Sequence, residues 1–160
     1  MSYGNFSYGS VTYGGGISSK RIAFDTKFFQ RKKFEDKTIS GYLRNSIKDL
    51  NIAVRSREPE VIFNFSYSSL IKSGIVLIAS FGYRVKSRTG HHVKILEKLS
   101  EILNDKDIEI IGDKMRKKRN LDLYEGGIII DSKEAKNYLN FVKRIIKKAE
   151  EYLENQKSLF

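Results

Sequence analysis

The fold of this chain is decided by residues 59–83, which read PEVIFNFSYSSLIKSGIVLIASFGY. From Val61 to Tyr83 this stretch carries a single charge, on Lys72, and it is apolar on most sides of a helix. A helix that is apolar all round belongs at the centre of a bundle. Asn64 and five serines interrupt the stretch, and a bilayer core has no water to satisfy such groups. The sequence therefore predicts a central buried helix and no membrane span.

Apolar residues three or four positions apart predict one further helix on each side of this stretch. The helix before it ends ahead of Pro59, because the residue before a proline avoids helical dihedrals, and the helix after it ends at Asn104-Asp105. The apolar stripes are Ile39, Leu43, Ile47, Leu50 and Val54 before the central helix, and His92, Ile95, Leu96, Leu99, Ile102 and Leu103 after it. Gly74 in the central helix is expected to let a neighbouring helix approach closely.

Two more helices complete the pattern. A fourth helix over about residues 107–124 stops at Gly126-Gly127, and a fifth opens with the capping sequence Asp131-Ser132-Lys133-Glu134. Only residues 127–130 read as extended chain. Five helices with short connections predict an all-α, up-and-down bundle of four to five helices over residues 36–158.

The first 35 residues form a separate region by composition. Tyr3, Tyr8 and Tyr13 recur among glycines, which predicts a flexible N-terminal tail over residues 1–19. Residues 20–35 read as a basic linker with four phenylalanines. These rings are expected to dock on the bundle, because so many exposed aromatic side chains would be unusual.

The overall composition narrows the chemistry. Lys and Arg number 30 against 19 Asp and Glu, a net charge of +11, which favours polyanions such as RNA, DNA, nucleotides or acidic lipid surfaces. The absence of cysteine excludes disulfides, thiolate metal sites and cysteine nucleophiles. Phosphate-binding glycine loops, zinc-protease motifs and serine-hydrolase motifs are absent too, so no metal or cofactor is expected. No basic-then-apolar leader opens the chain, and we expect a cytoplasmic location.

Arg119 is the anomaly of the fourth helix. The apolar stripe of that helix is Ile108, Ile111 and Met115, and the next position of the stripe holds a guanidinium instead of an apolar side chain. A buried or half-buried cation needs partners, which makes Arg119 a candidate functional residue. The alternative is a surface arginine paired with Asp122 one turn away.

Four more cations surround Arg119. Lys114, Arg116, Lys117 and Lys118 precede it within six residues, and on a helix they point in several directions, so they form a basic collar. Such a collar can bind phosphate, with arginine supplying two-pronged contacts. It can equally be a solvated helix end, where cations are favoured by the helix dipole.

The segment 116–125, RKKRNLDLYE, resembles the signature helix of the HEPN domains (higher eukaryotes and prokaryotes nucleotide-binding). The pattern of that family is an arginine, four to six residues and then a histidine, often with asparagine directly after the arginine. The Gly82-Tyr83-Arg84 and Gly90-His91-His92 segments are similar to the turn before the third helix in one HEPN subgroup. The resemblance covers residues 36–158.

This resemblance implies a bundle that forms a homodimer, in which the Arg119-Asn120 corners of two subunits meet in one cleft. In active members of the family such a cleft cuts RNA without a metal. Other members are toxins beside a small nucleotidyltransferase antitoxin, or accessory nucleotide-binding subunits. This chain departs from the pattern at Tyr124, which stands where the histidine is expected. Tyrosine is hardly ionised near neutral pH and is a poor general base.

Three functions therefore remain open. The first is an RNA- or nucleotide-binding dimer, with or without ribonuclease or toxin-like activity, in which Arg119, Asn120 and Tyr124 act at the cleft. The second is a non-catalytic subunit that partners a nucleotidyltransferase, and the third is a helical interaction module. The family resemblance places His91 and His92 away from the cleft, so a structural role at the start of a helix is expected for them.

Overall fold

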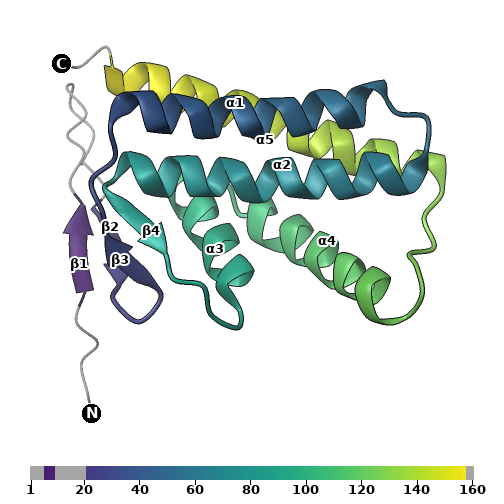
Figure 1. Cartoon of the computed structure of the whole chain (residues 1–160), viewed down its shortest axis with the longest axis horizontal. Coiled ribbons are helices and arrows are strands. Elements are labelled where there is room, and N and C mark those ends of the chain that lie inside the picture. Colours follow the sequence, from purple (N-terminus) through teal and green to yellow (C-terminus); the bar gives the residue numbers. More distant parts are fainter. Residues whose placement is uncertain (1–5, 10–20, 158–160) are drawn as a thin grey trace.

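The computed structural model describes residues 6–9 and 21–157, apart from the side chains of residues 6–9 and 122–124. The predicted tail, residues 1–19, lies outside this part of the chain except for residues 6–9. From Asp36 to Lys157 the chain forms an all-α bundle, as predicted (Figure 1). Its helices are α1 (Asp36–Arg55), α2 (Pro59–Ser80), α3 (His91–Leu103), α4 (Asp107–Tyr124) and α5 (Ser132–Lys157).

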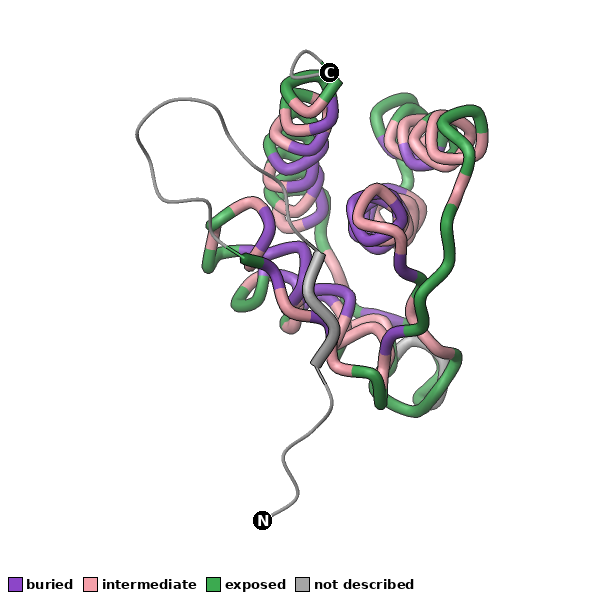
Figure 2. Tube along the Cα trace, turned by 90° about the vertical axis from the view of Figure 1, so that its left-hand side faces the viewer, coloured by how far each residue is buried: buried purple, intermediate pink, exposed green. Residues whose placement is uncertain are grey.

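Helix α2 is the centre of the bundle and packs against α1, α3 and α5. Figure 2 looks along the long helices, and the buried residues lie on the sides of the helices that face one another. By length and composition α2 is the one helix of the described chain that would suffice to cross a membrane, and 67% of its most apolar window is buried inside the protein. The prediction of a central buried helix is therefore confirmed.

Four of the five serines of α2, Ser68, Ser69, Ser73 and Ser80, find hydrogen-bond partners inside the bundle, and the buried Ser66 hydroxyl has none among the described residues. Ser46 of α1 and Ser69 of α2 each donate to the other's carbonyl oxygen, at 2.9 and 2.8 Å. One turn further along α1, the buried Asp49 carboxylate accepts from Ser68 at 2.7 Å and pairs with Lys72 at 2.6 Å. This polar seam aligns α1 with α2, because a buried carboxylate is stable only when it is paired.

Two glycines let α3 approach its neighbours. A Cβ atom added at Gly74 of α2 would lie 2.5 Å from Cγ2 of Ile95, and one added at Gly112 of α4 would lie 2.8 Å from Cδ2 of Leu96. The close approach predicted at Gly74 is confirmed. The matching contact at Gly112 was not anticipated, because it depends on the angle between α3 and α4.

Short strands occur where the sequence indicated a flexible tail, a linker and the turn before the third helix. Strand β1 (Phe6–Gly9) pairs with β2 (Ile22–Asp25), and β3 (Phe29–Arg31) pairs with β4 (Tyr83–Val85), both antiparallel. Residues 127–130, the one segment expected to be extended, form no strand. Strands of three or four residues are too short to show a period in the sequence, and β4 lies more than 50 residues from β3.

The linker rings dock as expected. The Phe24 side chain is fully buried, stacks on the Tyr83 ring at 4.0 Å between centroids and meets the Phe29 ring edge-on at 5.3 Å. The ammonium group of Lys98 lies 4.9 Å from the centre of the Phe24 ring and donates to the Ala23 carbonyl oxygen. These contacts fix β2 and the β3–β4 strand pair against α3 and the end of α2.

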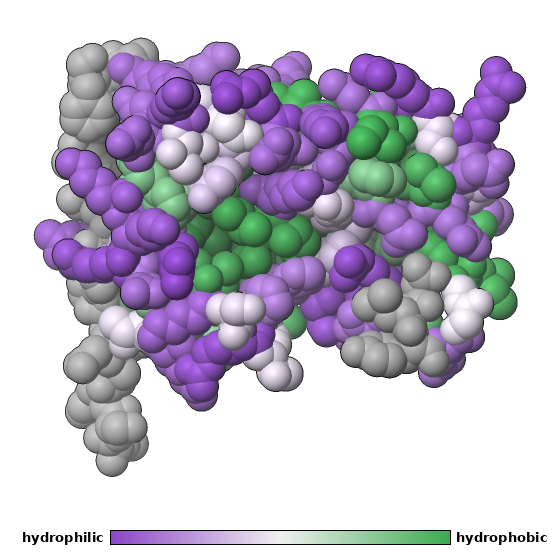
Figure 3. All heavy atoms as spheres, viewed as in Figure 1, coloured by the Kyte–Doolittle hydropathy of each residue, from purple (hydrophilic) through white to green (hydrophobic). Residues whose placement is uncertain are grey.

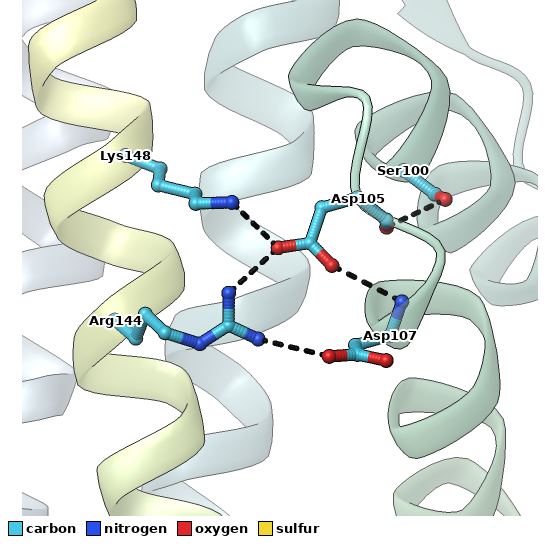
Figure 4. Close-up of polar contacts among 5 residues, drawn as sticks. All are labelled: Ser100, Asp105, Asp107, Arg144 and Lys148. Atoms are coloured by element: carbon cyan, nitrogen blue, oxygen red, sulfur yellow. Dashed lines mark hydrogen bonds and ion pairs between the residues drawn. The ribbon is translucent and has the colours of Figure 1, made fainter.

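The corner between α3 and α4 is pinned to α5 by Asp105 (Figure 4). Its carboxylate binds Arg144 and Lys148 of α5, each at 2.7 Å, and also accepts from the backbone N–H of Asp107 at 3.1 Å. Burial raises the pKa of Asp105, but the hydrogen bonds from Lys148 and Arg144 outweigh it and hold the pKa below its usual value. Ion pairs thus join the α3–α4 corner to α5.

The predicted cap of α5 is present in part. The Asp131 carboxylate accepts from the backbone N–H of Glu134 at 2.7 Å. The Glu134 carboxylate, which a capping box would return to the Asp131 backbone, instead pairs with Lys118 of α4 at 2.9 Å. The start of α5 is therefore tied to α4.

Candidate anion-binding site

The open ends of α3 and α4 flank a pocket. The two helices diverge from their shared corner in Figure 1, so the start of α3 faces the second half of α4. Gly90, with φ of 81°, turns the chain from the β4–α3 loop into α3. The pocket, named here the anion pocket, has a volume of about 500 Å³ and is lined by Ser87, Arg88, Thr89, Gly90, His91, His92, Arg116, Arg119 and Asn120. All of these residues are neutral or basic.

Arg119 is half-buried, and its guanidinium lies 5.5 Å from the centre of the Tyr67 ring of α2. Arg119 forms no ion pair with any carboxylate whose position the structure describes. The alternative prediction, a surface pair of Arg119 with Asp122, stays untested because the Asp122 side chain lies outside the described part of the chain. A cation over an aromatic face is stabilised without losing its charge. Arg119 therefore has a fixed position and an available positive charge.

Tyr67 and His92 form a hydrogen-bonded pair at the back of the pocket, with 2.9 Å between the hydroxyl oxygen and Nδ1. Burial raises the pKa of Tyr67 to about 12, although Arg119 and Arg116 act against it. Burial, and then the charges of His91, Arg119 and Arg116, lower the pKa of His92 to about 4. At neutral pH the pair is therefore an uncharged imidazole and an uncharged phenol.

His91 has a defined tautomer. Its Nδ1 lies 2.7 Å from the Arg88 carbonyl oxygen, and a carbonyl oxygen can only accept, so Nδ1 carries the hydrogen. In the neutral ring the lone pair is then on Nε2, the nitrogen that can accept a proton. The His91 ring meets the His92 ring edge-on at 4.5 Å.

The expectation that His91 and His92 lie away from Arg119 and Asn120 is wrong. All four residues line the anion pocket. His92 and Arg119 lie twelve and fourteen residues from Asn104 and Asp105 at the α3–α4 corner, so an antiparallel pair brings them level. Counting outward from the corner would have found this neighbourhood, whereas the family resemblance pointed away from it.

The basic collar is divided between different surfaces. Arg116 reaches the anion pocket while pairing with Asp113 at 2.8 Å, and Lys117 pairs with the same carboxylate at 2.9 Å. Lys114 and Lys117 line a separate groove of about 660 Å³ on α3 and α4, and Lys118 is bound to Glu134. The structure thus brings together Arg116, Arg119 and Asn120 of the predicted site.

The other predicted residues are placed differently. Lys114, Lys117 and Lys118 lie outside the anion pocket. Tyr124 ends α4, and its side chain is outside the described part of the chain. Among the side chains that are described, no three His, Asp or Glu residues come together in a way that could hold a metal ion.

The anion pocket can hold an oxyanion among the guanidinium groups of Arg88, Arg116 and Arg119, and His91, whose Nε2 can accept a proton, lines the same pocket. Comparison with the profiles of known protein families, with curated proteins and with solved structures finds no match to this chain.

Proposed function

We propose that this chain is a HEPN-like protein that binds a phosphate group of RNA or of a nucleotide in the anion pocket. The observation that carries this proposal is the Arg119 guanidinium, which is fixed against Tyr67 and forms no ion pair with a described carboxylate. Arg116 supplies a second guanidinium and Asn120 an amide that can bind a ribose hydroxyl. Hydrogen bonds to a charged phosphate are among the strong ones.

Binding of a labelled RNA dinucleotide tests this proposal. Replacing Arg119 with glutamine should weaken binding about tenfold or more, because a charge-assisted contact contributes roughly 1.5–3 kcal/mol. The matched control is Lys143→Gln, which removes one exposed positive charge from α5, outside the pocket. Equal affinities of the parent and Arg119→Gln would contradict the proposal.

RNA cleavage without a metal is a second candidate activity, and the orientation of His91 favours it. A ribose 2′-hydroxyl would give its proton to Nε2 of His91 while its oxygen bonds to phosphorus. The bond from phosphorus to the 5′-oxygen would break, and that oxygen would take a proton from solvent. Arg119 would stabilise the charge that develops on the phosphate oxygens.

Incubation with labelled RNA in EDTA tests this chemistry. The expected products carry a 2′,3′-cyclic phosphate and a 5′-hydroxyl, and His91→Gln should abolish them while dinucleotide binding persists. If the parent gives no products, this activity is excluded, and the non-catalytic role beside a nucleotidyltransferase is favoured. A flat salt dependence of RNA affinity would leave only the helical interaction module.

We further propose that two copies join so that their anion pockets share one cleft. Exposed apolar side chains on α4 support an association of two copies, since Ile110 and Leu121 are 57% and 50% exposed. At 100° per residue they lie on the side of α4 opposite Arg119, so the shared cleft itself rests on the family resemblance. A second copy would remove this apolar surface from water. The mass in solution tests the proposal: the parent should be a dimer, and Ile110→Asp with Leu121→Asp should give a folded monomer. A monomeric parent would contradict it.

A further inference from the structure

Three cations follow one another at alternate positions along β4 and the loop after it. They are Arg84, Lys86 and Arg88, named here the basic row. Tyr83 and Val85, the residues between and before them in β4, pack into or against the core, so Arg84 is turned outward. Alternate residues of an extended chain are roughly 6–7 Å apart. Arg84 in β4 and Lys86 directly after it have about this spacing, which is similar to that of phosphates along an extended nucleic-acid strand, whereas the bend at Ser87 turns the chain before Arg88.

Each member of the basic row is held by a neutral oxygen. Arg84 donates to the side-chain oxygen of Gln30 at 3.2 Å, Lys86 to the Thr26 carbonyl at 2.8 Å, and Arg88 to the Lys27 carbonyl at 2.9 Å. These bonds orient the side chains but neutralise no charge. Within the described chain, none of the three forms an ion pair with a carboxylate.

Some cations of the helices behave differently. Eight of them are paired with carboxylates: Lys72, Lys94, Lys98, Arg116, Lys117, Lys118, Arg144 and Lys148. Others, such as Lys143 and Lys147 of α5, form no ion pair with a described carboxylate either, so the basic row is distinguished by its place beside the anion pocket. In Figure 3, hydrophilic side chains cover the part of the face where Figure 1 draws β3, β4 and the loop that leads to α3.

The basic row leads into the anion pocket. Arg88 is its last member and also lines the pocket. Near Arg88 the half-buried Phe28 ring has three cations around it: Lys94 at 4.8 Å, Lys27 at 5.5 Å and Arg88 itself at 5.9 Å from the ring centre. A ligand with one phosphate in the pocket would therefore meet more positive charge in the direction of β4.

We propose that the basic row binds the backbone of a single-stranded RNA, one phosphate of which occupies the anion pocket. This inference rests on the proposed function and selects a polynucleotide over a free nucleotide as its ligand. One line of cations fits one backbone, whereas a duplex presents two. Arg84 and Lys86 each bind a phosphate beyond the pocket, and Arg88 contacts the same phosphate that occupies the pocket.

Salt titrations with oligouridylates of two and twelve nucleotides test the row in the unaltered protein. The two additional contacts should make the log–log slope of affinity against salt steeper by about 1.4 for the longer strand, at about 0.7 per phosphate contact. Equal slopes for the two lengths would overturn the inference. Tighter binding of a duplex RNA of the same length would overturn it too.

The double variant Arg84→Gln/Lys86→Gln locates the effect, since neither residue lines the anion pocket. It should lose the extra slope with the twelve-nucleotide strand and bind the dinucleotide as the parent does. The matched control Lys143→Gln/Lys147→Gln removes the same charge from exposed positions of α5 and should keep the slope. An equal loss in both variants would show a general charge effect and overturn the inference.

The two proposals fail in different ways. If the parent and Arg119→Gln bind the dinucleotide equally, the anion pocket is wrong as a site. If Arg119→Gln weakens dinucleotide binding but strand length leaves the slope unchanged, the pocket stands and the basic row is wrong. The variant Arg84→Lys/Lys86→Arg keeps both charges and should restore the salt slope of the twelve-nucleotide strand. This result separates loss of charge from damage to the β3–β4 strand pair.

Discussion

At the corner before α4, Arg144 and Lys148 of α5 share the Asp105 carboxylate, whereas about three turns into α4 the Arg119 guanidinium lies over an aromatic ring. At the corner the carboxylates of Asp105 and Asp107 balance the charges of Arg144 and Lys148 and join α5 to the α3–α4 pair. In the anion pocket the position of the cation is fixed, but its charge remains. The comparison teaches that a shared carboxylate makes Arg144 and Lys148 part of the fold, whereas an aromatic partner positions Arg119 and leaves its charge for a ligand.

The largest effect on stability is expected at the corner. Asp105→Ala removes both ion pairs and the acceptor for the Asp107 backbone, and it should lower the free energy of unfolding by about 2 kcal/mol. The cost stays moderate because Arg144 and Lys148 are 43% and 41% exposed and are hydrated when the carboxylate is lost. Because the Asp105 pKa is lowered, its contribution is lost only as the pH falls below the usual carboxyl range.

Urea unfolding at neutral pH measures this effect. The control is Glu151→Ala, which removes an exposed carboxylate from α5 and should change stability by less than about 0.5 kcal/mol. If Asp105→Ala were as stable as this control, the corner would not be the joint described here.

A smaller effect is expected from His92 in acid. Its pKa is about 4 in the folded chain and 6.5 in the reference state, so below pH 6.5 the unfolded chain binds a proton that the folded chain does not. Stability should therefore fall between pH 6.5 and about 4, by about 1–2 kcal/mol after allowance for the half-exposed ring. The variant His92→Gln keeps a polar partner for Tyr67 and should lack this part of the pH dependence. Parallel stability curves for the two proteins would contradict the prediction.

The smallest effect on stability is expected at Arg119 itself. Arg119→Leu restores the apolar stripe of α4 and exchanges a cation–π contact of roughly 0.5–1 kcal/mol for apolar packing against Tyr67, so the free energy of unfolding should change by less than about 0.5 kcal/mol. Dinucleotide binding should be lost in the same variant. Thermal unfolding and fluorescence titration measure the two properties, and strong destabilisation with intact binding would reverse the comparison.

The sequence predicted those features that depend on local spacing. The five helices, the backbone N–H of Glu134 bound to Asp131, the notch at Gly74 and the unusual position of Arg119 all follow from residues within a few turns of one another. The HEPN resemblance, the RNA ligand, the dimer and the cytoplasmic location stay predictions.

Features that depend on distant partners could not be predicted. The stack of Phe24 on Tyr83 joins residues almost 60 positions apart, and the strands it stabilises are too short to show a period. The division of the basic collar depends on carboxylates such as Glu134, which lies on another helix. Counting outward from the α3–α4 corner would have brought His92 level with Arg119, but the pocket between them depends on the angle at which α3 and α4 diverge.

The notches at Gly74 and Gly112 determine where the two imidazoles stand. They receive Ile95 and Leu96, neighbours on α3 that project about 100° apart, so α3 is held close to α2 on one side and to α4 on the other. The catalytic geometry proposed for His91 is thereby set by two missing methyl groups on other helices. Any relative of this protein that filled either notch would have to re-aim its histidines, even with every residue of the pocket unchanged.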